Sequence, residues 1–269
     1  MSRSLNFTVN VVSGRAEVVE LKNARGSIQH YFHFFLGGLL PLINHLVEHG
    51  EDRPVCIRTD VGPMHRILEE LPIKLGDSPN DVDHSLPGFD CFLDEDIGPE
   101  GINLMTPEIR ARILDWFERT LPPELDSGDS PKVILVERAR DPFFNSANAE
   151  VKTSGADRRS ISNHNEVKDL LQKKYGNAFR NVVLEKESIY SQYRLFSRAD
   201  LVVAQHGAAL ANIFFMSEGS HVVEIAPPWG RGLNMFGNLS RQCRVRYSLI
   251  EQQENHSPVD LDALRHILG

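Results

Sequence analysis

Residues 201–226 read LVVAQHGAALANIFFMSEGSHVVEIA, and this stretch decides the fold. An apolar run stops at Gln205, a helix-like segment follows over residues 208–216, and a second apolar run contains Glu224. Short apolar runs on both sides of a helical segment predict two parallel strands joined by a helix. The sequence therefore predicts an α/β fold with a parallel sheet.

The first turn of this unit combines His206, Gly207, Ala208 and Ala209. A helix N-terminus presents free backbone N–H groups and a positive dipole end, so it can seat a phosphate. The same turn could be purely structural, with His206 capping the helix. Glu224 ends the next strand, where open α/β sheets bind ligands, and could hold a ribose or pair with an arginine.

Composition narrows the class of protein. The chain has 269 residues, a net charge of −8 and three cysteines, Cys56, Cys91 and Cys243, with no CxxC spacing. A protein with this negative net charge is not expected to have a broad surface that binds nucleic acid. Any phosphate must then be bound by a local cluster of arginines. No apolar run reaches the length of about 18 residues that spans a membrane. The first residues lack the long apolar core of a signal peptide, and the three cysteines are far apart in the sequence. Both features favour a cytoplasmic location.

The chain divides at residues 121–132, LPPELDSGDSPK, which are rich in proline, glycine, serine and acid. We expect an N-terminal α/β domain over residues 1–128, a Rossmann-like domain over residues 129–255, and a final helix in residues 256–269 that could pack back on the N-terminal domain. In the second domain, strands are expected at residues 133–136, 182–185, 201–204 and 244–249, and helices at residues 163–175, 189–197, 232–241 and 261–268.

The N-terminal half is less regular. Residues 7–12 and 16–21 are expected to pair as a hairpin, and residues 30–48 to form a helix that Gly37, Gly38 and Pro41 interrupt. Further strands are expected at residues 54–58 and 89–93, and helices at residues 64–71 and 107–120.

Arginines stand at the predicted ligand edge of the sheet. Arg138 follows the strand at residues 133–136, and Arg158 and Arg159 precede the helix that Asn163 is expected to cap. The planar guanidinium fork suits phosphate oxygens and stays charged. The alternative is that these are ordinary solvated arginines.

Two further groups could touch a substrate. His30 and His33 lie three residues apart at the start of a helix, where His33 could take a proton from a hydroxyl. A buried, backbone-bonded histidine is the simpler alternative. Trp229, Arg231 and Asn234 lie beyond the strand of Glu224, in a loop that could contact a sugar or merely connect two elements.

A metal site is not expected. Residues 81–83 and 94–96 match the DxD or related acidic pattern that holds a metal in many sugar-nucleotide enzymes, but the pattern is common in exposed loops. His45 and His49 are interpreted as a surface pair.

In combination, these motifs resemble glycosyltransferase family 61. The resemblance covers residues 133–247 and an upstream segment, residues 30–42. Its parts are Val136-Glu137-Arg138, Arg158-Arg159-Ser160-Ile161-Ser162-Asn163 with Asn165-Glu166, His206-Gly207-Ala208-Ala209-Leu210-Ala211-Asn212, and Val222-Val223-Glu224-Ile225.

The resemblance implies a GT-B-like fold, with two Rossmann-like halves facing a cleft, and an inverting transfer from a UDP-sugar that needs no metal or other cofactor. It implies donor binding by Arg138, Arg159, Asn163, by residues 206–209 and by Glu224, with a glycan acceptor on the N-terminal side. Xylose and N-acetylglucosamine are the donor sugars that the family suggests.

The upstream segment departs from the family pattern, because Gly37 and Gly38 stand where the family has an acidic residue. His33 is then the candidate catalytic base. Two alternatives stay open: a non-catalytic nucleotide- or glycan-binding protein, and a metal-dependent transferase that uses an acidic motif. No Gly-x-Ser-x-Gly turn supports a hydrolase.

Overall fold

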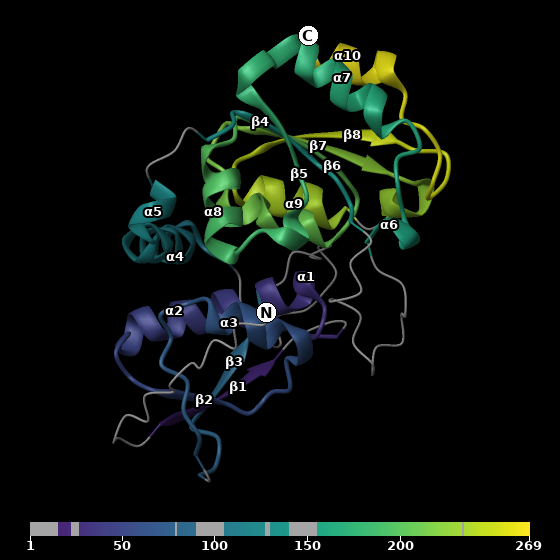
Figure 1. The fold of residues 1–269 in the computed structure, drawn as a ribbon. Coiled ribbons are helices and arrows are strands. Elements are labelled where there is room, and N and C mark those ends of the chain that lie inside the picture. Colours follow the sequence, from purple (N-terminus) through teal and green to yellow (C-terminus); the bar gives the residue numbers. More distant parts are fainter. Residues whose placement is uncertain are drawn as a thin grey trace, which may run out of the picture.

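The computed structural model describes two parallel β-sheets joined by helices (Figure 1), which confirms the α/β prediction. The described residues are 16–22, 27–78, 80–89, 105–126, 130–139, 155–232 and 234–269.

The larger sheet lies in the C-terminal half. Its strands are β4 (Val133–Val136), β5 (Phe179–Val182), β6 (Leu201–Gln205), β7 (His221–Ala226) and β8 (Arg246–Glu251). They are all parallel and follow the order β5-β4-β6-β7-β8. The strand β5 is thus added on one side of β4, and β6, β7 and β8 are added on the other side. Such a switch point between β4 and β6 opens a crevice at the carboxyl ends of the strands.

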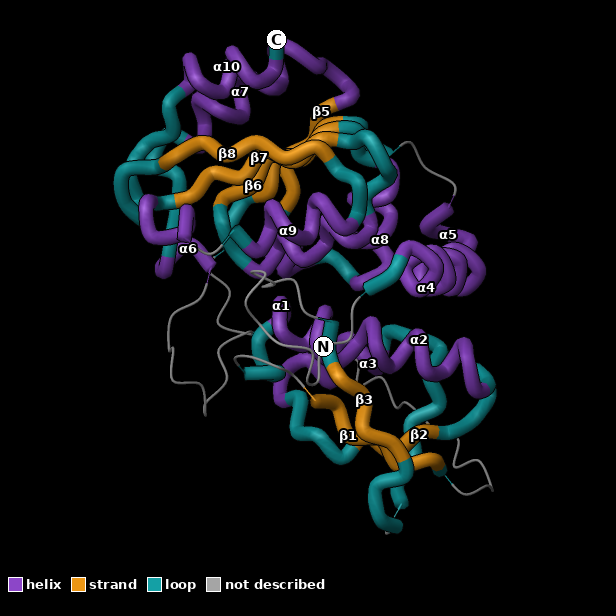
Figure 2. The backbone as a smooth tube through the Cα atoms, turned by 180° about the vertical axis from the view of Figure 1, so that it is seen from behind, coloured by secondary structure: helices purple, strands orange, loops and turns teal. Residues whose placement is uncertain are grey.

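Helices cover both faces of this sheet (Figures 1 and 2). On one face lie α7 (His164–Tyr175) and α10 (Leu261–Leu268). On the other face lie α8 (Ile189–Arg198), the 3₁₀ helix η6 (Ala208–Phe215) and α9 (Met235–Gln242). The expectation that the final helix could return to the N-terminal domain is wrong. Leu264 is fully buried among the residues under α7, and Lys174 of α7 donates to the carbonyl of Leu268 over 3.1 Å.

The smaller sheet consists of β1 (Glu17–Lys22), β2 (Val55–Ile57) and β3 (His84–Pro87), in the order β2-β1-β3. The expected strand at residues 16–21 is confirmed, and both of its described neighbours are parallel to it. Its expected hairpin partner, residues 7–12, and most of the expected strand at 89–93 lie outside the described residues. The strand β3 was not predicted.

The interrupted helix is confirmed. It consists of α1 (Tyr31–Phe34), the π-helical turn η1 (Phe35–Leu39) and α2 (Leu40–His49). The two glycines lie in the wide π turn, and they let it approach the sheet closely. A Cβ on Gly38 would lie 3.1 Å from Leu21 of β1, and one on Gly88 would lie 2.6 Å from the Cα of Gly37. This packing explains why the helix is widened where it crosses β1.

One cluster of buried hydrophobic side chains runs through both halves, and a second lies under α7 and α10. Phe35 packs edge-on against Phe214 and Phe215, with ring centroids 6.0 and 5.2 Å apart, and Phe32 packs against Phe236 at 5.6 Å. Burying one such side chain contributes about 1.5–3 kcal/mol. In Figures 1 and 2, α1 and α2 accordingly lie between the two sheets, below α8 and α9.

The helix α4 (Pro107–Thr120) strengthens this junction. Thr106 caps it as expected, by accepting from the backbone N–H of Ile109 over 3.3 Å. On one side its Arg112 donates to Asn44 of α2 over 3.1 Å. On the other, Phe117 stacks on Tyr193 of α8 at 5.3 Å. The divide predicted at residues 121–132 contains a further short helix, α5 (Pro123–Asp126).

Local differences from the predicted elements have simple causes. The strand expected at residues 182–185 is β5, three residues earlier, because Phe179 and Val182 both point into the core and the buried Leu184 begins a 3₁₀ turn, η5 (Leu184–Lys186). The helix expected at residues 208–216 is a 3₁₀ helix. The remaining short elements are η2 (Gly62–Met64), α3 (His65–Glu69), α6 (Gly155–Arg158), η4 (Gly176–Ala178) and η7 (Pro228–Gly232).

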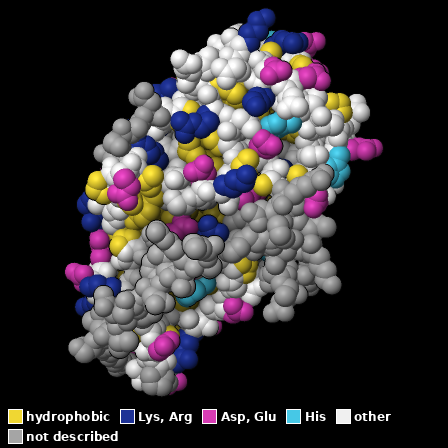
Figure 3. All heavy atoms as spheres, viewed as in Figure 1, with side chains coloured by type: hydrophobic (Ala, Val, Ile, Leu, Met, Phe, Trp, Pro, Cys, Tyr) yellow, Lys and Arg dark blue, Asp and Glu magenta, His cyan; other side chains and the backbone are white. Residues whose placement is uncertain are grey.

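None of the helices in the described ranges is long and apolar enough to cross a bilayer. On the face drawn in Figure 3, acidic and basic side chains are interspersed over the described surface. The two described cysteines, Cys56 and Cys243, are buried free thiols, and burial raises the pKa of Cys243 to about 11.

Candidate functional site

The candidate site lies at the switch point of the larger sheet. Arg138 follows β4 and His206 follows β6, so the two residues meet at the carboxyl ends of neighbouring strands. Arg138 donates through Nη1 to the carbonyl of His206 over 3.2 Å and through Nε to the carbonyl of Gly155 over 3.1 Å. A Cβ on Gly207 would overlap Nη1 of Arg138. The glycine of this turn is therefore needed for the guanidinium to lie against the backbone.

Three arginines share this corner, where the charge of Glu185 acts on Arg138 and the charge of Glu224 acts on Arg159. Arg159 is only 6% exposed, and its Nε has no hydrogen-bond partner among the described residues. Burial, together with the charges of Arg138 and Arg158, lowers the pKa of Arg159 to about 9. Burial also lowers the pKa of Arg138, with Arg158 adding to the effect. Buried like charges are costly unless an opposite charge joins them, so a bound anion would stabilise this corner.

Glu224 holds the ring of His206. Its Oε1 lies 2.5 Å from Nδ1 of His206, and its Oε2 accepts from the hydroxyl of Tyr247 over 2.7 Å. His206 and Glu224 are 4% and 3% exposed. The partners of Glu224 are thus a histidine and a tyrosine, not the arginine considered as the alternative to a ribose. Such a carboxylate fixes the orientation of an imidazole.

The loop after β7 places an aromatic ring over the arginines. Trp229 is 47% exposed, and its ring centroid lies 4.9 Å from Cζ of Arg159 and 5.1 Å from the ring of His206. Its Nε1 donates to Asn255 over 3.1 Å, which fixes the ring. An exposed aromatic face beside a charged pocket can hold a base or a sugar ring by stacking.

The other two predicted loop residues contribute differently. Asn234 is exposed and takes a left-handed conformation (φ 32°) at the start of α9. The backbone of Arg231 lies in η7, whereas its side chain lies outside the described residues.

Asn163 fixes the backbone near the arginines. It does not cap α7, since its side chain donates to the carbonyl of Val259 over 3.0 Å and accepts from the N–H of Val259 over 2.9 Å. Gln205 likewise donates to the carbonyl of Ser160, next to Arg159, over 3.0 Å. These amides fix the segment that carries the arginines. In the turn itself, Ala208 is exposed.

The N-terminal half reaches this corner through α1. Burial and the charge of Arg158 both lower the pKa of His30, which shows that the start of α1 faces the arginines. Burial, with a smaller effect from His30, lowers the pKa of His33 to about 4. Phe236 links the two sides, because its ring packs against Phe32 of α1 at 5.6 Å and against His206 at 5.2 Å.

Sequence reasoning missed Tyr247 and Phe236, and it missed a contact between the halves. Tyr31 donates its hydroxyl to Asn212 over 2.8 Å and lies 3.0 Å from Gln192, so the asparagine that ends the motif of η6 ties α1 to the larger sheet. The signal for Tyr247 is its place on β8, the neighbour of β7, whose parallel register brings it beside Glu224.

The acidic motifs that were considered as metal sites do not form a group of metal ligands in the described residues. Residues 94–96 lie outside them, and Asp83 accepts from the backbone N–H of Val18 over 2.9 Å. The interpretation of His45 and His49 as a surface pair is wrong for His45, which is 5% exposed and lies 3.3 Å from Glu17.

Comparison with known protein families gives a match. Residues 31–223 match the sequence model of the family described as Glycosyltransferase 61, and this range covers well over half of the chain. It begins at α1 and ends within β7, so it includes both His33 and the turn at His206. No curated protein matches the chain.

Proposed function

Because the chain belongs to the glycosyltransferase 61 family, we propose that it is an inverting, metal-independent enzyme that moves a sugar from a UDP-sugar to a hydroxyl of a glycan. The two parallel sheets are in this proposal a compact form of the GT-B arrangement. The larger sheet binds the donor, the helix α1 contributes to the acceptor side, and the reaction takes place in the cytoplasm.

The observation that carries the proposal is the cluster of buried arginines at the switch point. The diphosphate of the donor would lie against Arg138 and Arg159, with Trp229 beside it. When the bond from the anomeric carbon to the phosphate oxygen breaks, the leaving UDP gains negative charge. Fixed cations at that point stabilise the charge, and removing one such donor typically costs about 10²–10³ in rate.

His206 lies beside the arginines at the same end of the sheet. Its Nδ1 is occupied by Glu224, which leaves Nε2 to contact the diphosphate. Glu224 in this proposal acts through His206, because both of its oxygens are already engaged and it is almost fully buried.

On the acceptor side, His33 takes the proton of the attacking hydroxyl while the hydroxyl oxygen bonds to the anomeric carbon from the face opposite UDP. Burial lowers the pKa of His33 to about 4, so its ring is uncharged at neutral pH and able to accept a proton. A bound diphosphate would raise that pKa, because negative charge favours an imidazolium. Xylose and N-acetylglucosamine are the proposed donor sugars.

A non-catalytic nucleotide- or glycan-binding protein is the second candidate. One observation favours it: the positions where the family has an acid are buried glycines, and a Cβ on Gly38 would already press on Leu21 and Ile28 at 3.1 and 3.2 Å. A carboxylate at this position therefore requires the side chains of Leu21 and Ile28 to shift. The candidate predicts binding of UDP without turnover.

A thermal-shift panel followed by a product assay separates these functions. UDP, UDP-xylose, UDP-N-acetylglucosamine and GDP are added with and without EDTA. A ligand at a hundred times its Kd stabilises the folded protein by about 2.7 kcal/mol. Stabilisation by a uridine ligand that survives EDTA supports the donor site, and release of UDP in the presence of a glycan acceptor supports the transferase. Loss of turnover with EDTA would instead indicate the metal-dependent mechanism, and no shift with any nucleotide would refute the donor site.

A further inference from the structure

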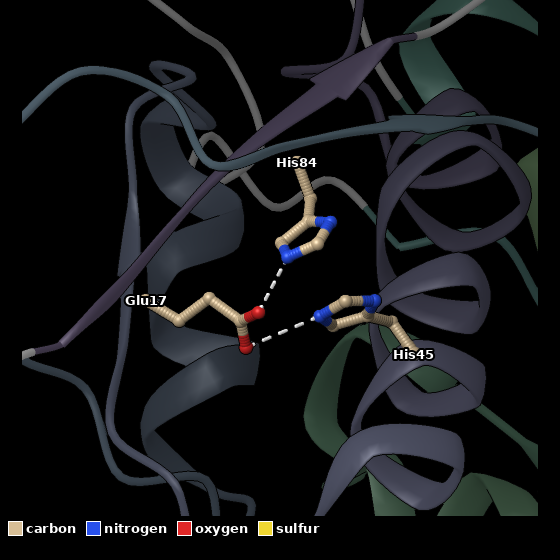
Figure 4. Close-up of side chains that lie close together, drawn as sticks. All are labelled: Glu17, His45 and His84. Atoms are coloured by element: carbon tan, nitrogen blue, oxygen red, sulfur yellow. Dashed lines mark hydrogen bonds and ion pairs between the residues drawn. The ribbon is translucent and has the colours of Figure 1, made fainter.

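A second cluster of polar side chains lies in the N-terminal half, away from the arginines. Glu17 is the first residue of β1, His84 is the first residue of β3, and His45 lies on α2. Figure 4 shows both imidazoles pointing their Nε2 atoms at the carboxylate of Glu17. The Oε1 atom of Glu17 is 2.6 Å from His84, and its Oε2 atom is 3.3 Å from His45.

The atoms that converge are electron-pair donors. One ligand atom from each of Glu17, His45 and His84 lies within 4.8 Å of the other two. His49 stacks on His45 with centroids 4.3 Å apart, and its Nδ1 lies 3.0 Å from the carbonyl of His45.

We propose that Glu17, His45 and His84 bind one divalent transition-metal ion of the zinc type. Two imidazole nitrogens and one carboxylate oxygen are an established donor set for Zn²⁺, with bonds of about 2.0–2.2 Å. Tetrahedral geometry then separates ligand atoms by about 3.3–3.5 Å, so small side-chain shifts from the present hydrogen-bonded arrangement accommodate the ion. Mg²⁺ is excluded as the preferred ion because it favours oxygen ligands and retained waters.

The fourth position faces a surface pocket. Glu17 and His84 line this pocket together with Arg53, Pro54 and Asp83. A water molecule from this pocket can complete the coordination. The ion would join α2 to the first residues of β1 and β3, at the amino ends of the strands. The proposal does not depend on the transferase function, since the proposed donor site is at the carboxyl ends of strands in the other sheet.

Zinc binding to the full-length chain, freed of any affinity tag, tests the proposal. Zn²⁺ is titrated in competition with a chromophoric chelator, and Tm is measured with Zn²⁺, with Mg²⁺ and with EDTA. We expect one equivalent of Zn²⁺ to bind and to raise Tm, and Mg²⁺ at the same concentration to leave Tm unchanged. Co²⁺ in place of Zn²⁺ should give visible absorption bands from a nitrogen- and oxygen-ligated centre.

His84→Gln is the principal variant, because this side chain is 42% exposed and its loss disturbs packing least. Glu17→Gln is the second, and circular dichroism checks that each variant folds. Both should weaken Zn²⁺ binding by at least about a hundredfold. Even the replacement of a residue that only hydrogen-bonds to a metal ligand typically lowers metal affinity by about 10–100-fold.

His65→Gln is the matched control. His65 forms an exposed pair with Glu69 in the same half, at 3.6 Å, without a second histidine in that pair. It should keep the affinity of the original chain. Absence of tight Zn²⁺ binding, unchanged affinity in a folded His84→Gln variant, or an equal loss in His65→Gln would each overturn the proposal.

Discussion

The two parallel sheets carry their buried polar clusters at opposite ends. In the larger sheet, Arg138 and His206 lie at the carboxyl ends of β4 and β6, beside Arg159. In the smaller sheet, Glu17 and His84 open β1 and β3 at their amino ends. The first cluster has more cations than anions, whereas in the second two imidazoles share one carboxylate.

This difference shows that the charges within a cluster indicate whether its ligand is an anion or a cation. Buried guanidinium groups cannot readily lose their protons, so a corner rich in arginine requires an anion. Imidazoles are uncharged donors of electron pairs, so a carboxylate between two of them suits a cation. The following predictions test the contrast, starting with the largest expected effect.

Replacing Arg159 by methionine should break the anion site while leaving the fold intact. We expect Arg159→Met to lower turnover by about a hundredfold or more, because the leaving diphosphate loses a fixed cation. Without ligand, Tm should stay constant or rise, since one of three neighbouring positive charges is removed from a buried position. Turnover and Tm are measured together.

Arg180→Met is the control for this prediction, because Arg180 is exposed on β5. It should change neither quantity. A folded Arg159→Met enzyme with full turnover would remove the arginine corner from the donor site.

A methyl group on Gly207 should damage the same site indirectly. Gly207→Ala places a Cβ where Nη1 of Arg138 now lies, so the guanidinium must leave its contact with the carbonyl of His206. We expect turnover to fall by at least about tenfold, a loss of roughly 1.4 kcal/mol in transition-state stabilisation. The control Arg180→Met, at an exposed position on β5, should retain turnover; equal losses in both variants would contradict the role of the close approach.

The pH dependence of stability should report the burial of His33. Its pKa of about 4 in the folded protein lies below the ordinary value of 6.5, so the unfolded chain binds the proton more readily. Stability is therefore greatest above pH 6.5 and is lost as pH falls toward 4. His33→Gln should reduce this loss in Tm measured between pH 7 and pH 4, whereas an identical slope in both proteins would indicate that His33 is not shielded.

The stacking residue should show the smallest effect. Trp229→Ala removes the ring over Arg159. A contact of this kind is worth about 0.5–1 kcal/mol at an exposed position, so we expect the KM for the donor to rise about two- to fivefold. Trp229→Phe keeps an aromatic face and should restore most of the affinity. If Trp229→Ala binds the donor as well as the original chain, the ring does not contact it.

Local sequence patterns predicted most of the larger sheet. The apolar runs of β4, β6 and β7 are continuous because both faces of these strands are buried. The position of β5 was harder to predict, since its pattern is interrupted by the exposed Arg180. The turn at His206 and the arginine at the end of β4 were visible because carboxyl ends of parallel strands meet at one edge of the sheet.

The remaining features depend on contacts between distant segments. His45 and His84 are brought to Glu17 by the packing of α2 against the smaller sheet, and no local periodicity links them. Tyr247 reaches Glu224 through the register of β7 and β8. The helix after His206 is a 3₁₀ helix, although its composition suits an α-helix, because tertiary packing outweighs intrinsic propensity.

The shared core at Phe35, Phe214 and Phe215 has a consequence for the engineering of this protein. In a protein whose halves meet only across solvent, one half can be exchanged for that of a relative to change the acceptor. Here the exchanged half must also reproduce a set of interlocking rings and the hydrogen bond from Tyr31 to Asn212. Under the proposed function, acceptor preference is therefore open to redesign by single substitutions and not by recombination of modules.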